Sequence, residues 1–124
     1  MLSAFVAVTV LVVPPAADAA TRRATDPDAR IRFTLDNRVL TVRLLRRAPR
    51  GVRRQLYGHR IEAVCGTGFP DFTAGVRVRR TRLWPQGRRR LRYRFDRNIS
   101  RRARWCSLEP YRSTNDVATV FFSR

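Results

Sequence analysis

The sequence contains no lysine. All 27 of its basic residues are arginine, against nine acidic residues and a single histidine. Selection for bidentate phosphate contacts enriches arginine, but it does not remove lysine from every loop and strand. A genome rich in GC codons explains the missing lysine better. The net charge of +18 is still a physical property of the chain, and it predicts attraction to nucleic acid, anionic glycans, acidic lipids or wall polymers that weakens as salt rises.

Residues for catalysis and for metal binding are also scarce. A serine-type triad needs a histidine to carry the proton, and only His59 is present. Two cysteines and one histidine do not complete four protein ligands for a metal ion unless a carboxylate joins them. We therefore expect no catalytic residues, no metal site and no cofactor.

One enzymatic alternative stays open. His59, Glu62 and neighbouring arginines are the residue types that would act as acid, base and phosphate clamp in a small secreted nuclease. On a strand, however, two residues three apart point to opposite faces. This spacing argues against direct cooperation between His59 and Glu62.

Long hydrophobic runs are missing everywhere except at the N-terminus. Residues 2–13 are largely apolar, Pro14-Pro15 ends the run, and Ala17-Asp18-Ala19 supplies the small-x-small pattern that signal peptidases cleave. An uncleaved anchor would need about twenty apolar residues, and the two prolines interrupt the run earlier. No arginine precedes the run, although standard signal peptides carry positive charge there. We predict that residues 1–20 are a cleaved signal peptide, that the protein is secreted, and that no membrane span remains.

The two cysteines are the only candidates for a covalent cross-link. Without residues 1–20 the chain has the size of one small domain, and such a domain has a thin core. Cys65 and Cys106 are an even number of cysteines in a chain that leaves the reducing cytoplasm. We predict a disulfide between them, with two buried free thiols as the alternative.

Short alternating segments predict an all-β chain. Residues 21–29 have no periodicity and are expected to be a flexible leader, so the single domain covers residues 30–124. A β-hairpin around Asp36-Asn37-Arg38 is the clearest local pattern, and a short helical insert fits between Pro49 and Gly58. We expect seven strands, near residues 31–35, 40–44, 60–65, 75–83, 91–95, 103–109 and 117–122.

Several short strands divided by turns favour a small antiparallel β-sandwich, with a small barrel or an immunoglobulin-like sandwich as variants. The strand count and the single cysteine pair fit the immunoglobulin-like variant. Two features do not: Arg104 stands where a tyrosine corner would have tyrosine, and the cysteines fall on the third and sixth strands rather than the second and sixth. In the segment 75–83 the alternation slips, which predicts a bulge near Arg79-Arg80.

Arginine alternates with apolar residues on two of these strands. Like charges at neighbouring positions destabilise a sheet unless an anion compensates them. The alternative is that these arginines form an ordinary solvated face with no binding role, and that their number reflects the codon preference of the genome. The anion-binding candidates are Arg77, Arg79 and Arg82 on one strand and Arg90, Arg92 and Arg94 on the next, which we expect to be its neighbour.

The sequence therefore predicts a secreted, non-enzymatic binding module with a basic surface. Its expected partner is an anionic polymer, namely a cell-wall polymer, a glycan or a nucleic acid, or else another protein outside the cell. A small cationic hydrolase or nuclease is one alternative function, and a cationic toxin or antimicrobial protein is another. The sequence contains no indication of the oligomeric state.

Overall fold

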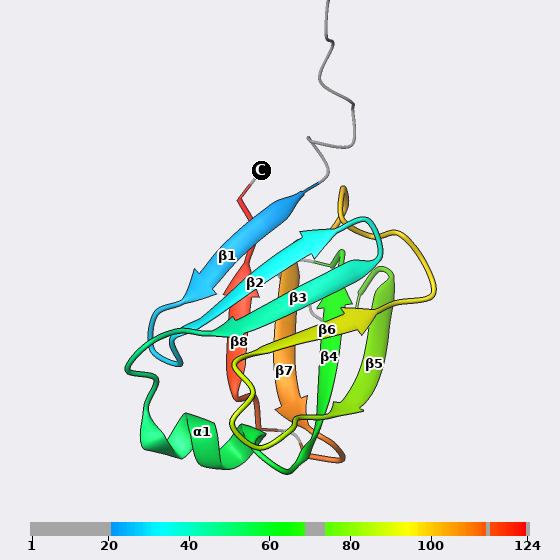
Figure 1. Ribbon diagram of the computed structural model, residues 1–124. Coiled ribbons are helices and arrows are strands. Elements are labelled where there is room, and N and C mark those ends of the chain that lie inside the picture. Colours follow the sequence, from blue (N-terminus) through cyan, green and yellow to red (C-terminus); the bar gives the residue numbers. More distant parts are fainter. Residues whose placement is uncertain (1–20, 69–73, 114, 124) are drawn as a thin grey trace, which may run out of the picture.

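Two antiparallel sheets pack face to face in the computed structural model, which describes residues 21–68, 74–113 and 115–123 (Figure 1). The predicted signal peptide at 1–20 lies outside these residues. Sheet A has the strand order β1-β2-β3-β6, and sheet B has the order β5-β4-β7-β8. The elements are β1 Arg22–Asp26, β2 Ile31–Asp36, β3 Val39–Leu44, α1 Arg50–Leu56, β4 Arg60–Gly66, β5 Arg77–Leu83, β6 Arg90–Arg94, β7 Trp105–Pro110 and β8 Ala118–Phe121. The predicted β-sandwich is confirmed.

The first strand differs from the sequence prediction. Residues 21–29 were expected to be a flexible leader, and this is wrong for Arg22–Asp26, which pairs with β2 along its whole length. The carboxylate of Asp26 accepts hydrogen bonds from the backbone N–H of Asp28 at 3.0 Å and from that of Thr119, in β8, at 3.0 Å. Thr119 is 93 residues away in the sequence, so this contact cannot be read from the local pattern. The described residues therefore form eight strands rather than seven.

The predicted hairpin and helical insert are both confirmed. Asp36 pairs with Val39, which leaves a two-residue turn, and Asn37 adopts the left-handed conformation with φ 55° that such turns favour. Helix α1 follows Pro49, and Gly58 just after it has φ 77°, as is common where a helix ends. No helix within the described residues is long and apolar enough to cross a membrane.

Strand β5 has no bulge. Its pairing with β4 runs without a break from Arg60 opposite Leu83 to Gly66 opposite Arg77. Val78 is buried, and Arg80 and Arg82 on the same side of the strand are exposed. Because β5 is an edge strand, these long side chains extend past the core into solvent. The alternation slips for this reason, and the register does not change.

The apolar core lies between the inner faces of the two sheets. Trp84 and Tyr93 are its largest fully buried side chains. The Tyr93 hydroxyl donates a hydrogen bond of 3.0 Å to the backbone carbonyl of Ile61 and so links β6 of sheet A to β4 of sheet B. Burial raises the pKa of Tyr93 well above its ordinary value, which keeps the hydroxyl protonated as a donor.

The predicted disulfide between Cys65 and Cys106 is confirmed. The two residues lie directly opposite each other on β4 and β7, their Cα atoms are 4.1 Å apart, and both side chains are buried. The bond therefore joins two neighbouring strands of sheet B. In immunoglobulin domains the disulfide connects the two sheets, so this cross-link is of a different kind.

Removing the disulfide with Cys65→Ala and Cys106→Ala is expected to lower the free energy of unfolding by about 4 kcal/mol, because the bond closes a long loop in the unfolded chain. Urea denaturation of both proteins measures the difference. Reduction of the wild type should produce the same loss, whereas the double variant should not respond to the reductant. Equal unfolding free energies for the wild type and the double variant would contradict the prediction.

Candidate functional site

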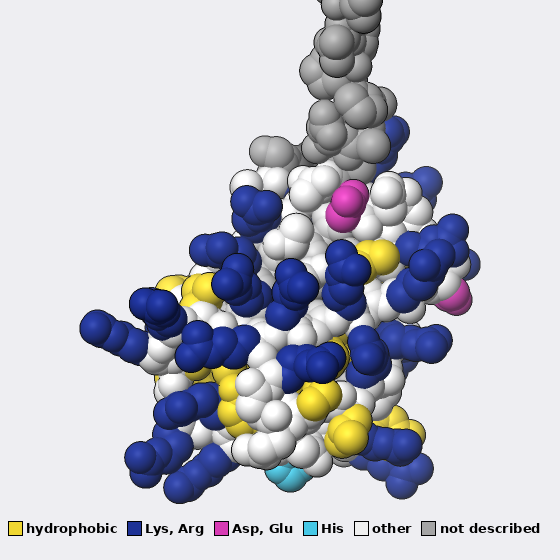
Figure 2. All heavy atoms as spheres, viewed as in Figure 1, with side chains coloured by type: hydrophobic (Ala, Val, Ile, Leu, Met, Phe, Trp, Pro, Cys, Tyr) yellow, Lys and Arg dark blue, Asp and Glu magenta, His cyan; other side chains and the backbone are white. Residues whose placement is uncertain are grey.

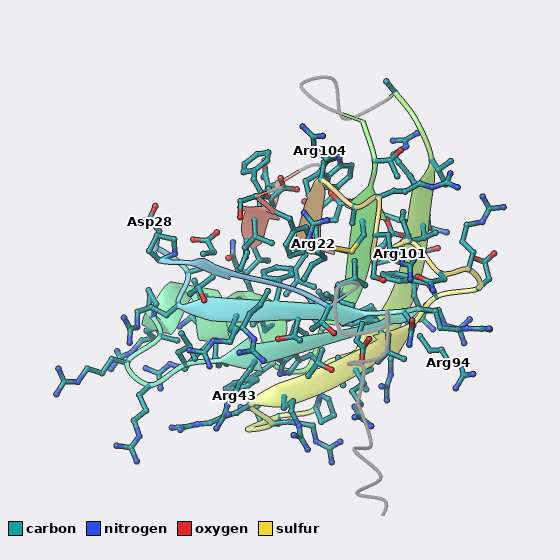
Figure 3. The ribbon with its side chains drawn as sticks, turned by 90° about the horizontal axis from the view of Figure 1, so that it is seen from above. Arg22, Asp28, Arg43, Arg94, Arg101 and Arg104 are labelled. Carbon is teal, nitrogen blue, oxygen red and sulfur yellow. A yellow bond between two sulfur atoms is a disulfide. The ribbon has the colours of Figure 1, made fainter. Side chains whose placement is uncertain are left out.

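The outer face of sheet A is covered with arginine (Figure 2). Side chains alternate between the two faces of each strand, so the residues between the buried positions point away from sheet B. Figure 3 shows Arg43 and Arg94 extending into solvent from this side. We call this surface the basic face, and its six arginines are Arg23, Arg32, Arg43, Arg90, Arg92 and Arg94.

The strand register arranges these arginines in rows across the sheet. Arg32 lies opposite Arg43, and Arg43 lies opposite Arg90, so three adjacent strands carry arginine at matched positions. Side chains at such positions have Cβ atoms about 4.5–5.5 Å apart, and like charges there repel. In the next row, Thr34 and Thr41 separate Arg23 from Arg92.

Acidic side chains do little to neutralise the basic face. Of the described residues on this face, Asp36 alone carries a carboxylate, and it accepts a hydrogen bond of 3.4 Å from the Thr21 hydroxyl. Within residues 21–68, 74–113 and 115–123 the single ion pair joins Arg79 to Glu62 at 3.7 Å, on sheet B. The positive charge of the basic face is therefore not balanced by ion pairs among the described residues.

Two hollows are lined by arginines of the basic face, one on the face itself and one at its β6 edge. The first, of about 270 Å³, lies on the basic face and is lined by five of its six arginines together with Thr34 and Thr41. The second, of about 540 Å³, lies beside the edge strand β6 and is lined by Arg82, Arg88, Arg89, Arg90, Leu91 and Arg92. Because Arg90 and Arg92 line both hollows, the basic surface continues from the basic face to the β6 edge.

The structure divides the six predicted anion-binding residues among three places. Arg90, Arg92 and Arg94 lie together on the basic face. Arg77 and Arg79 lie on the outer face of sheet B, because β5 and β6 belong to different sheets and are not the expected neighbours. Arg82 points the other way along β5, and its guanidinium donates a hydrogen bond to the backbone carbonyl of Arg92. Arg82 therefore lines the second hollow, beside β6.

Three arginines of the basic face were missed by the sequence prediction. Arg32 and Arg43 alternate with apolar residues in β2 and β3, so the hairpin pattern contains the signal that places them on the outer face. Their position beside Arg90 depends on the pairing of β3 with β6, which the sequence does not show. Arg23 lies in the strand that was not expected.

Acidic groups gather on the outer face of sheet B. Glu62 lies opposite Glu109, and a hollow of about 220 Å³ is lined by Glu109, Asp116, Ser107 and Arg79 among others. Burial raises the pKa of Glu109 to about 7, and hydrogen bonding to Asp116 and Glu62 and their negative charges add to this shift. The two outer faces of the sandwich therefore differ in chemistry.

The residues considered for catalysis do not form a common site. His59 is exposed, and its backbone carbonyl accepts a hydrogen bond of 2.9 Å from the N–H of Trp84. Glu62 is engaged elsewhere, with Arg79 and with the Thr81 hydroxyl at 3.3 Å. No hydrogen bond or ion pair between described residues joins His59 to Glu62, and no group of three or more histidine, cysteine or acidic side chains in this part of the chain could hold a metal ion.

Comparisons with protein-family models, with curated proteins and with solved structures find no match to this chain. Its function must therefore be argued from the chemistry of its surface. The most concentrated chemistry on the described surface is that of the basic face, where strand register and not chain proximity gathers the arginines.

Arg43→Thr is expected to stabilise the protein at low salt. The change removes the middle charge of the row and thus two repulsive cross-strand pairs, each worth about 0.2–1 kcal/mol, and threonine is well suited to strands. Urea denaturation should show a gain that shrinks at high salt, because salt screens exposed charges. Arg80→Thr is the control, since Arg80 lies opposite Ala63 and should show no comparable gain. A less stable Arg43→Thr protein would refute the repulsion.

Glu109→Gln is expected to reduce the dependence of stability on pH. The folded protein holds the Glu109 proton more firmly than the unfolded chain does, because the pKa rises from 4.5 to about 7 on folding. The stability contributed by this group is therefore present below pH 4.5 and is lost as pH rises toward 7.

Glutamine resembles the protonated side chain and does not ionise, so the variant should gain stability relative to the wild type between acidic pH and pH 8. Urea denaturation across this range measures the effect. Asp96→Asn, at an exposed loop position, is the control. If the wild type and Glu109→Gln change in parallel with pH, the raised pKa is wrong.

Proposed function

We propose that this protein is a secreted, non-enzymatic binding module that holds linear polyanions on the basic face of sheet A. The observation that carries the proposal is the row of Arg32, Arg43 and Arg90 at matched positions on three adjacent strands. Such a row costs stability in the free protein. An anionic partner bound across the strands converts that repulsion into attraction.

The side chains of the basic face favour recognition of charge. Guanidinium groups bind phosphate, sulfate and carboxylate through paired hydrogen bonds, and the hydroxyls of Thr25, Thr34 and Thr41 lie between them on the same face. The described residues of this face include no aromatic side chain, so bases or sugar rings have nothing to stack on. The ligand is therefore held by its backbone charges.

The spacing of the arginines favours a polymer over a small anion. Neighbouring strands are about 4.8 Å apart, and side chains on one face repeat about every 6.7 Å along a strand. The six guanidiniums thus form a two-dimensional array. A single phosphate contacts one or two members of such an array, whereas a chain of anionic groups contacts many.

Secretion is supported by two independent features. The first is the apolar run with a small-x-small pattern at residues 1–20. The second is the Cys65–Cys106 disulfide, because such bonds persist mainly in oxidising compartments. Outside the cell, the available polyanions are wall polymers, glycans and released nucleic acid.

Two triple variants of equal charge test this function. Arg32→Gln/Arg43→Gln/Arg90→Gln removes the row from the basic face, and Arg50→Gln/Arg53→Gln/Arg54→Gln removes the same charge from α1. Fluorescence anisotropy with labelled polyphosphate, heparin and RNA at low salt measures binding. The row variant should lose about tenfold or more in affinity, and the logarithmic salt dependence should become shallower by about two.

The helix variant should lose far less affinity, and thermal unfolding checks that both variants are folded. Equal losses in the two variants would show that net charge alone governs binding and would contradict a site on the basic face. Failure of the wild type to bind any of the three polyanions at low salt would overturn the proposed function.

A further inference from the structure

The second basic hollow, beside β6, is built on ordered backbone. Trp84 is fully buried, and its indole N–H donates a hydrogen bond of 2.7 Å to the backbone carbonyl of Arg88. The backbone N–H of Arg88 donates to the Pro85 carbonyl at 3.1 Å, and the Arg89 carbonyl accepts a hydrogen bond of 2.7 Å from the N–H of Leu44 in β3. These bonds fix the turn that presents Arg88 and Arg89.

Arg82, from β5 of sheet B, also lines this second hollow. Its guanidinium donates a hydrogen bond to the carbonyl of Arg92, so a cation from β5 lies against the β6 edge. The hollow is open to solvent and shares Arg90 and Arg92 with the hollow on the basic face. A ligand that lies along the row of Arg32, Arg43 and Arg90 therefore meets further guanidiniums where the sheet ends.

We propose that the polyanion is a flexible, single-chain phosphate polymer that follows this row, bends over the β6 edge and ends in the second hollow. This inference rests on the proposed function of the basic face. From β2 to β6 the chain crosses two strand spacings, about 10 Å, before it reaches Arg88 and Arg89. A single phosphate cannot occupy both hollows, and a longer chain can.

The ligand must be flexible because its path changes direction at the edge strand β6. Duplex DNA has a persistence length of about 150 base pairs, so it does not bend over one strand and cannot follow the path from the first hollow into the second. A flexible chain bound in the first hollow presents its next phosphates to the second at high effective concentration. A polymer with stacking rings gains nothing further, since neither hollow is lined by an aromatic side chain.

The experiment compares inorganic tripolyphosphate, long-chain polyphosphate, duplex DNA and heparin at equal total charge, by calorimetry on the wild type and two double variants. Arg88→Gln/Arg89→Gln alters the second hollow alone. Arg101→Gln/Arg102→Gln is the matched control, because this pair is also adjacent, exposed and outside the strands. Thermal unfolding verifies the fold of each variant.

The wild type should bind long-chain polyphosphate at least about tenfold more tightly per phosphate than tripolyphosphate. Arg88→Gln/Arg89→Gln should lose most of this gain with chain length, and the control should keep it. Duplex DNA and heparin should bind more weakly than long-chain polyphosphate, and their affinities should change less in Arg88→Gln/Arg89→Gln.

An equal chain-length gain in Arg88→Gln/Arg89→Gln and the wild type would overturn the path over the β6 edge. Duplex DNA or heparin binding as tightly as long-chain polyphosphate would overturn the requirement for a flexible phosphate chain. In both cases the proposed function survives if the basic-face triple variant still loses affinity. Absence of all polyanion binding would overturn the function and the inference together.

Discussion

Burial of apolar side chains between the two sheets is the constraint on which the rest of the structure depends. Arginine is rarely buried unless it is paired, and in the described residues one ion pair forms. The alternating strands resolve this conflict by placing residues such as Phe33 and Val42 inside and Arg32 and Arg43 outside. The core therefore determines where the positive charge gathers, and a thin core is reinforced by the Cys65–Cys106 disulfide.

The two sheets carry different chemistry on their outer faces although they share one core. Sheet A presents six arginines with one carboxylate, while sheet B places Glu62, Glu109 and Asp116 near Arg79. This asymmetry gives the molecule one strongly basic side and places Glu62, Glu109 and Asp116 away from it. Figure 2 shows the basic side. The net charge follows from the composition, and the register of sheet A decides where the arginines gather.

Most of the fold was predictable because its signals are local. The turn at Asp36-Asn37-Arg38 lies between two alternating segments, and Pro49 and Gly58 bracket the helix. The disulfide could be predicted from the even number of cysteines together with the expected export of the chain. Strand β1 was not predicted because none of its residues is fully buried, and the hydrogen bond that Asp26 accepts from Thr119 joins it to a residue far away in the sequence. The sequence predicted a bulge in β5 because it does not show that β5 is an edge strand. On such a strand arginine is exposed on both sides without any change of register.

The sequence by itself determined the class of fold, the disulfide, the excess of positive charge and the outward direction of arginine on β2, β3 and β6, because these follow from composition and from a period of two residues. Only the tertiary structure decided which strands became neighbours. It placed β6 next to β3 in sheet A, so Arg90 lies in one row with Arg32 and Arg43. It placed β5 in sheet B, which separates Arg77 and Arg79 from that row. Strand pairing depends on how two whole sheets bury their inner faces together, and no short segment of the chain contains that information.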